Sequence, residues 1–347
     1  MKAIILHAPG KYSLEHVKRP VCPDDGILLK VEFCGLCGSD LRTLRDGHKN
    51  VVLPAIIGHE VSGIIEETGK SYKGSFIPGN WLCAAPNVYC GKCRFCLAGR
   101  FDLCENLREI AQHWPGGFAE YMVIPAEALN LGVIRLLPSG LKPEYGCIAE
   151  PASSCISAQE KLNVGLGDSV LIIGTGPIGS IHICIAHARG ASKIIVADIA
   201  PKRLEMCRAF GPDYCINTHE TDVIKETRKL TDGVGADVVI TANPVPITQS
   251  QALEAAAKGG RIAFFGGLPH NASKVELDTN LIHYKALTVI GTTGFAPKHH
   301  ILALEMMRAG LIPGEKLVSQ ILPLDDFASG VEMAAEGRAM KVVFRME

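Results

Sequence analysis

One short stretch of the chain constrains its fold more than any other. The apolar run Leu171–Ile173 leads directly into a glycine-rich segment, and a helix-like segment follows it as far as Arg189. Glycines at this spacing allow a tight turn and let a pyrophosphate approach the N–H groups at the start of the helix. Pro177 suits a first helical turn. We therefore predict a dinucleotide-binding turn made of Gly174, Gly176, Pro177, Ile178 and Gly179.

An acidic residue stands where such a turn requires one. Asp198 ends the next apolar run, 19 positions after Gly179, where this kind of fold binds the 2′-hydroxyl of the adenosine ribose. Its negative charge would repel a 2′-phosphate, so the sequence favours NAD over NADP. Lys202 and Arg203 follow closely and keep NADP open as the second choice. Arg203 is included among the predicted cofactor contacts.

The segment around this turn alternates between short apolar runs and helix-length amphipathic stretches, a pattern typical of a parallel sheet covered by helices. The predicted strands are Val170–Ile173, Ile194–Ala197, Val238–Ile240, Ile262–Phe265 and Val289–Ile290. We assign residues 155–294 to a doubly wound, NAD-binding Rossmann domain.

The rest of the chain has a different residue pattern. Residues 1–154 are rich in glycine, proline and short β-branched runs such as Ile27–Val31 and Val61–Ile65, which predict a mostly β domain. After the Rossmann segment, a helix-like stretch at His300–Arg308 and a last strand at Lys341–Phe344 resume the pattern of residues 1–154. We therefore predict an α/β protein in which residues 1–154 and 295–347 form a mostly β, zinc-binding catalytic domain.

Composition excludes some classes of function. Lys plus Arg (35) almost cancel Asp plus Glu (36), so no net field attracts nucleic acid or an anionic membrane. The apolar run at the N-terminus is too short for a signal peptide, and we expect a cytoplasmic protein. In that reducing compartment, the 13 cysteines are expected to be free, catalytic or bound to metal.

Four cysteines form a compact cluster with the spacing C-x2-C-x2-C-x7-C. They are Cys90, Cys93, Cys96 and Cys104. Four converging thiolates suit a closed structural zinc site, in which the metal supplies folding energy that a loop with few apolar residues lacks. An iron–sulfur cluster also uses closely spaced cysteines, but the last gap is too long and Glu105 stands in place of the expected proline.

A second set of candidate ligands is more dispersed. Cys37 lies in Cys37-Gly38-Ser39-Asp40, and His59 and Glu60 follow. Alone, such a cysteine is more often a small core residue and such a histidine a satisfied polar group. Together, a thiolate, an imidazole and a carboxylate suit a catalytic zinc site with an open position. Glu150 lies where the two residue patterns meet and is a further ligand candidate. A role in a surface salt bridge is an equally weighted alternative for this residue.

These motifs together resemble the zinc-containing medium-chain dehydrogenases over essentially the whole chain. The shared motifs occur in family order: Cys37-Gly38-Ser39-Asp40, Gly58-His59-Glu60, the cysteine cluster, Gly116-Gly117-Phe118-Ala119-Glu120-Tyr121, Ala149-Glu150-Pro151 and the glycine turn. The resemblance implies a GroES-like catalytic domain, a catalytic zinc on Cys37, His59 and Glu60, and Glu150 bound directly or through water. It also implies a structural zinc on the four cysteines and a homodimer or homotetramer.

Within the family, Glu60 after His59 and Glu150 before Pro151 look like the sorbitol (polyol) and threonine dehydrogenase branch, which extends to enzymes of polyol phosphates. The chain departs from sorbitol dehydrogenases at Arg42-Thr43, where they have His and Tyr, and at Gly291–Phe295, where they carry an arginine. The proton-relay imidazole of many relatives is thus missing. Ser39, His48 or water would have to serve instead, and the catalytic candidates are Ser39, His48, Glu60 and Glu150.

We therefore predict hydride transfer from a secondary alcohol, a polyol or sugar-derived alcohol, to NAD. A phosphorylated polyol is one alternative, because Arg42, Arg45, His48 and Lys49 form a basic cluster close to the predicted ligands. L-Threonine is a second. A non-catalytic protein that binds zinc and a dinucleotide is a rival from another class, although near-zero charge argues against nucleic acid as its partner. A zinc-free quinone reductase would lack both ligand sets.

Overall fold

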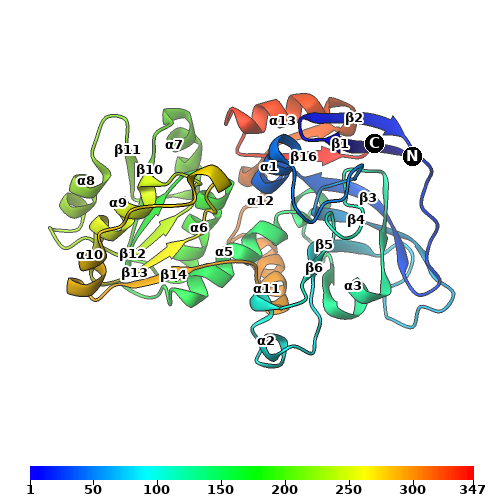
Figure 1. Cartoon of the computed structure of the whole chain (residues 1–347), viewed down its shortest axis with the longest axis horizontal. Coiled ribbons are helices and arrows are strands. Elements are labelled where there is room, and N and C mark those ends of the chain that lie inside the picture. The colour runs from blue at the N-terminus through cyan, green and yellow to red at the C-terminus, as the bar shows by residue number, and fades with distance from the viewer. The chain divides into compact units, whose positions relative to one another are not determined.

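The structure is a computed structural model that describes residues 1–347, except for the side chain of His270. It divides into two compact units (Figure 1). Unit 1 comprises Met1–Ser153 and Gly294–Glu347, and unit 2 comprises Ser154–Thr293. The helix α5 (Ala149–Lys161) contains one of the boundaries. No helix among the described residues combines the length and the apolar character that a bilayer-spanning segment requires.

Unit 2 is built on one parallel sheet of six strands in the order β11-β10-β9-β12-β13-β14. Its strands are β9 (Ser169–Ile173), β10 (Lys193–Asp198), β11 (Tyr214–Asn217), β12 (Ala236–Thr241), β13 (Ala256–Phe264) and β14 (Thr288–Gly291). Its helices are α6 (Pro177–Ala188), α7 (Pro201–Cys207), α8 (Val223–Leu230), α9 (Ile247–Ala255) and α10 (Thr279–Tyr284), with 3-10 turns η2 (Arg208–Phe210) and η3 (His270–Ala272). The strand order reverses between β9 and β12, which is where doubly wound sheets bind their ligands.

The central strands of this sheet are apolar because both faces are covered. Val170–Ile173 of β9 and Ile194–Ala197 of β10 are buried along their whole length, as expected for strands covered by helices. The longest departure from the sequence prediction is β13, which begins at Ala256 rather than Ile262. A register shift splits its pairing with β12, and Gly259 there adopts φ +73°, a backbone conformation that glycine accepts without strain.

Unit 1 is mostly β. A hairpin of β1 (Lys2–Ala8) and β2 (Lys11–His16) accompanies a sheet in the order β15-β16-β3-β4-β5-β6, to which β7 adds on β3 and β8 on β5. The other strands are β3 (Ile27–Gly35), β4 (Glu60–Thr68), β5 (Trp81–Val88), β6 (Arg108–Glu109), β7 (Tyr121–Ile124), β8 (Gly132–Leu136), β15 (Val318–Pro323) and β16 (Lys341–Arg345). The helices are α1 (Gly38–Asp46), α2 (Arg94–Leu97), α3 (Ala126–Leu131), α4 (Pro143–Gly146), α11 (Pro297–Arg308), α12 (Gly314–Leu317) and α13 (Phe327–Ala335), with 3-10 turns η1 (Phe101–Leu103) and η4 (Leu324–Asp326).

The C-terminal segment is part of the core of unit 1. Strand β16 pairs antiparallel with β3, with Phe344 opposite Cys34. The ring of Phe327 lies 4.9 Å from that of Phe118 and 4.8 Å from that of Phe344, so three distant segments share one buried aromatic cluster. The predicted fold class, a mostly β unit together with a doubly wound parallel sheet, is confirmed.

Candidate functional site

The structure brings Cys37, His59 and Glu60 together in unit 1. One potential ligand atom from each lies within 4.8 Å of the others. Cys37 is the residue that caps the N-terminus of α1, His59 precedes β4, and Glu60 is the first residue of β4. A thiolate, an imidazole and a carboxylate at this separation fit a divalent ion of borderline softness such as zinc.

Asp40 fixes two of these residues. Its Oδ2 accepts a hydrogen bond from the Cys37 backbone N–H at 3.0 Å, and its Oδ1 lies 3.2 Å from His59 Nδ1. With Nδ1 engaged, His59 Nε2 is left for a metal. Burial acts to lower the pKa of His59, but the charges and hydrogen bonds of Asp40 and Cys37 outweigh it and raise that pKa well above its usual range.

Glu60 is held by a buried lysine. Lys341 Nζ donates to Glu60 Oε1 at 2.7 Å and to the carbonyl of Leu36 at 2.9 Å. Glu60 Oε2 lies 2.5 Å from the same nitrogen but receives no well-directed hydrogen bond. A buried carboxylate oxygen that accepts no hydrogen bond can donate an electron pair to a metal cation. The free Oε2 of Glu60, and not only the three residue types, therefore supports a metal ion at this site.

The space for this carboxylate depends on a glycine. A Cβ atom added to Gly35 would lie 2.1 Å from Glu60 Oε2. Sequence analysis missed Gly35 and Lys341. Lys341 had a detectable signal, because a single charged residue in the otherwise apolar strand Lys341–Phe344 requires a buried partner. Gly35 had no such signal, since many glycines in this chain serve turns.

The other predicted catalytic residues lie at different distances from this group. Ser39 Oγ is 3.4 Å from His59 Nε2, on the side of the ring that faces the ligand group. Glu150 is not among the three grouped ligands. Burial raises its pKa to about 7; the charge of His59 acts to lower this pKa, and the charge of Glu60 acts to raise it. His48 lies just beyond α1 in an exposed position, and its Nδ1 accepts from the N–H of Asn50 at 3.3 Å.

The four cysteines of the lobe, Cys90, Cys93, Cys96 and Cys104, also converge, with ligand atoms within 4.8 Å of one another. Backbone N–H groups point at their sulfurs: Cys90 N–H donates to Cys104 Sγ at 3.3 Å and Cys93 N–H to Cys90 Sγ at 3.4 Å. The N–H groups of Lys92 and Cys93 lower the pKa of Cys90 to about 6. Donors aimed at sulfur stabilise thiolates, so the lobe fits a closed tetrahedral zinc site.

In unit 2 the glycine turn has the expected shape. Gly174 adopts φ +107°, and a Cβ on Gly179 would lie 2.0 Å from the Gly174 carbonyl oxygen, so only glycine permits this close approach. Gly176 caps the N-terminus of α6, and Pro177 and Ile178 begin the helix. The N–H groups at this end are available to an anion.

Asp198, at the end of β10, is tied to the glycine turn. Its Oδ2 accepts hydrogen bonds from the Thr175 N–H at 2.8 Å and hydroxyl at 2.9 Å, and its Oδ1 accepts from the Ala200 N–H. Thr175 is a site residue that sequence analysis missed. A Cβ on Gly176 would lie 3.0 Å from Arg203 Nη1, so this guanidinium also borders the turn. Such a cradle fits the pyrophosphate and ribose of a dinucleotide.

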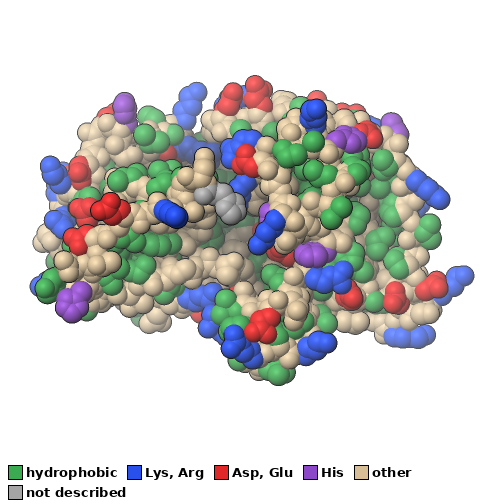
Figure 2. All heavy atoms as spheres, viewed as in Figure 1, with side chains coloured by type: hydrophobic (Ala, Val, Ile, Leu, Met, Phe, Trp, Pro, Cys, Tyr) green, Lys and Arg blue, Asp and Glu red, His purple; other side chains and the backbone are tan. Residues whose placement is uncertain are grey.

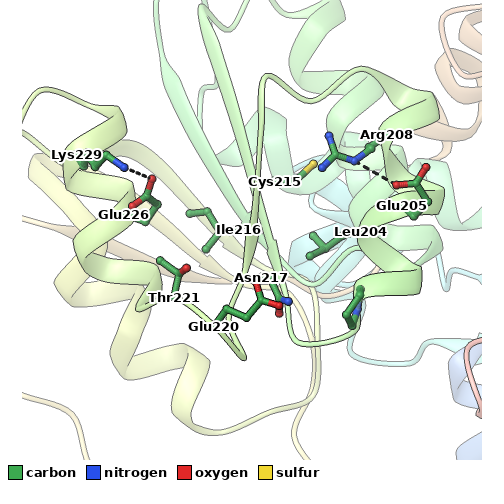
Figure 3. Close-up of a pocket in the computed structure, with 11 residues that line it drawn as sticks. Leu204, Glu205, Arg208, Cys215, Ile216, Asn217, Glu220, Thr221, Glu226 and Lys229 are labelled. Carbon is green, nitrogen blue, oxygen red and sulfur yellow. Dashed lines mark hydrogen bonds and ion pairs between the residues drawn. The ribbon is translucent and has the colours of Figure 1, made fainter.

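A separate pocket of about 560 Å³ lies in unit 2, between α7, β11 and α8 (Figure 3). It contains neither the metal ligands nor the glycine turn. On the face shown in Figure 2, basic and acidic side chains are mixed, in keeping with a net charge of −1.

Known proteins match along the whole chain. A family model described as "Zinc-binding dehydrogenase" matches residues 177–308, and one described as "Alcohol dehydrogenase GroES-like domain" matches residues 23–133. L-Threonine 3-dehydrogenase of Pyrococcus horikoshii is 32% identical over 360 residues, covering 100% of this chain and 99% of that protein. Sorbitol dehydrogenase of Bacillus subtilis is 30% identical over 343 residues, covering 97% and 94%. A zinc-binding dehydrogenase from Sinorhizobium meliloti, solved bound to NADP, superposes with a TM-score of 0.91 at 30% identity, covering 99% and 98%.

Proposed function

The chain belongs to the zinc-containing medium-chain dehydrogenase family, and from that premise we propose that it oxidises a secondary alcohol of a small polyol or sugar-derived substrate with NAD. The observation that carries the proposal is the grouping of Cys37, His59 and Glu60 in a buried frame made by Asp40 and Lys341. The similarity to a sorbitol dehydrogenase supports a polyol as substrate. We propose a cytoplasmic homodimer or homotetramer.

In this proposal Cys37, His59 and Glu60 hold the catalytic zinc, Glu150 binds it directly or through water, and the four lobe cysteines hold a second, structural zinc. When bound, the catalytic ion supplies Lewis-acid polarisation of the substrate oxygen and the dinucleotide accepts the hydride. Asp40 keeps His59 in the tautomer that presents Nε2, and the Lys341 ammonium group holds the Glu60 carboxylate in place.

Ser39 is the proposed first proton acceptor. Its hydroxyl lies 3.4 Å from His59 Nε2, so it is on the metal side of the ring and within reach of an alcohol bound beside the ligand group. Arg42 replaces the usual relay imidazole, and its exposed guanidinium does not accept a proton. The proton would pass from Ser39 to water, with His48 at the exposed end of α1 as the alternative acceptor.

The preference for NAD rests on Asp198. Its carboxylate is fixed by Thr175 and Ala200, and in this proposal it contacts the adenosine ribose, where an acidic residue disfavours the 2′-phosphate of NADP. The relative solved with NADP and the position of Arg203 beside the turn support NADP as the alternative.

A phosphorylated polyol is the second candidate, and one observation favours it. Arg45 donates to both oxygens of Asp46, at 2.9 and 2.7 Å, whereas Arg42 is exposed and forms no ion pair among the described side chains. Arg42 is therefore the arginine of this cluster available to a phosphate.

The test is dinucleotide reduction by the zinc-loaded protein with polyols, polyol phosphates, L-threonine and simple alcohols, each with NAD or NADP. We expect NAD and a polyol to give the highest kcat/KM, and a chelator to abolish turnover until zinc is restored. Absence of turnover with every alcohol, in protein that binds zinc and dinucleotide, would favour the non-catalytic reading. Arg42→Ala should lower kcat/KM for a phosphorylated polyol far more than for the free polyol, and Arg45→Ala is the matched control. If Arg42→Ala lowers kcat/KM equally for the two substrates, the proposal of a phosphorylated substrate is wrong.

A further inference from the structure

Three hydrogen bonds from the protein fix the carboxylate of Asp198 at the end of β10. Thr175 donates two of them to Oδ2, from its N–H at 2.8 Å and from its hydroxyl at 2.9 Å. The N–H of Ala200 donates the third to Oδ1 at 2.9 Å. Because a carboxylate has about four lone-pair positions, most of them are used inside the protein. What remains on Oδ1 is available to a hydroxyl group of the ribose.

The hydroxyl of Thr175 is the part of this arrangement that depends on the side chain. Thr175 lies between Gly174 and Gly176 and is fully buried. If the carboxylate of Asp198 turned away, the hydroxyl would lose this partner without gaining water in its place, which is costly for a buried donor. Hydrogen bonds to a charged group are also among the stronger ones in proteins. The hydroxyl therefore opposes rotation of the Asp198 side chain.

We propose that Thr175 is a positioning residue that sets the specificity for the cofactor, because its hydroxyl keeps the Asp198 carboxylate from turning away from a 2′-phosphate. This inference rests on the proposed dinucleotide site. An acid free to rotate would make room for NADP, and Arg203, whose Nη1 borders Gly176, would attract the phosphate. A fixed acid instead accepts a hydrogen bond from the ribose hydroxyl of NAD and repels the phosphate of NADP.

The test compares the dissociation constants of NADH and NADPH, measured by fluorescence titration of the zinc-loaded full chain. Thr175→Val keeps the shape of the side chain and the N–H but removes the hydroxyl. We expect it to lower the ratio of the NADPH constant to the NADH constant about tenfold, as for the loss of one hydrogen bond to a charged group. Thr175→Ala also lacks the hydroxyl and should change the ratio in the same direction. Thr175→Ser keeps a hydroxyl and should retain the wild-type ratio.

Two controls show whether the hydroxyl acts through Asp198. Thr227 in α8 is equally buried, and its hydroxyl has no hydrogen-bond partner among the described residues, so Thr227→Val should leave the ratio unchanged. In an Asp198→Ala background, Thr175→Val should have no further effect on the ratio, because the group that it positions is absent. The thermal midpoint of each variant is measured as well, which separates a loss of folding from a loss of specificity.

The outcomes distinguish this inference from the proposed function. If the wild-type protein prefers NADH but Thr175→Val and Thr175→Ala leave the ratio unchanged, the inference is wrong and the proposed function stands. An equal effect of Thr175→Val with and without Asp198 would also overturn the inference. If the wild-type protein prefers NADPH and Thr175→Val still lowers the ratio, the proposed cofactor is wrong and the inference stands. Binding of neither dinucleotide would overturn both.

Discussion

The two groups of candidate metal ligands in unit 1 are assembled in opposite ways. The lobe cysteines lie between positions 90 and 104, and neighbouring backbone N–H groups orient their sulfurs. Cys37, His59 and Glu60 instead depend on distant residues, since Lys341 is 281 positions from Glu60. A local loop relies on its metal for stability, whereas the buried frame of the second group is stabilised by the fold itself. Removal of metal should therefore unfold the lobe and leave the other group in place.

The largest expected effect is the loss of a lobe ligand. Cys96→Ser should release the proposed structural ion, and with it most of a contribution that is on the order of 10 kcal/mol in structural zinc sites. We expect a lower thermal midpoint, loss of one zinc per chain and proteolysis within the lobe. His59→Ala is the comparison: it should abolish turnover with a much smaller change in midpoint. Equal destabilisation by the two variants would contradict the distinction between the groups.

The next effect tests the buried frame. Lys341→Met leaves the Glu60 carboxylate buried without its cation, which typically costs about 3–5 kcal/mol. We expect a lower urea midpoint and weaker binding of the proposed catalytic zinc. The double variant Lys341→Met with Glu60→Gln removes both charges, so it should recover most of the stability while turnover stays low. A double variant no more stable than Lys341→Met would mean that Lys341 acts through packing and not through charge.

A smaller effect should come from the space around the same carboxylate. Gly35→Ala places a methyl group 2.1 Å from Glu60 Oε2 in a buried setting, and overpacking of this kind costs about 1–3 kcal/mol. Because the carboxylate must move, zinc affinity should fall together with the urea midpoint. Gly38→Ala is the matched control, since a Cβ at Gly38 meets nothing within 4 Å. If both substitutions change zinc affinity equally, the contact with Glu60 is not the cause.

The same contrast explains how much could be predicted from sequence. The apolar runs, the glycine spacing and their order were sufficient for the α/β fold class, because buried parallel strands and tight turns restrict residue type strongly. The local cysteine spacing indicated a metal group directly. For Cys37, His59 and Glu60 the residue types alone suggested a zinc site, and the resemblance to a family made that prediction specific, since separate segments carry no spacing rule. The structure groups those three and leaves Glu150 outside the group.

What sequence analysis missed are the residues that act through others. Thr175, Gly35 and Lys341 matter because the fold places them against Asp198 and Glu60, and those contacts span up to 281 positions. Residue type alone does not reveal such pairs. Asp40 is another residue that acts through others: position N3 of α1 brings it beside both Cys37 and His59, so it caps the helix and orients a ligand at once.

The smallest expected effect concerns an ion pair on the lobe that, unlike Lys341–Glu60, is exposed to solvent. Arg94 Nε lies 3.0 Å from Glu105 Oε1, but the side chains are 76% and 46% exposed, against 4% and 0% for the buried pair. Water already solvates both exposed charges, so Arg94→Gln should cost less than about 1 kcal/mol and leave the zinc content unchanged. The comparison is made by unfolding at low and high salt: only the Arg94 pair should lose its small contribution as salt screens it. A large, salt-independent loss from Arg94→Gln would show that the lobe, too, relies on a distant or buried frame.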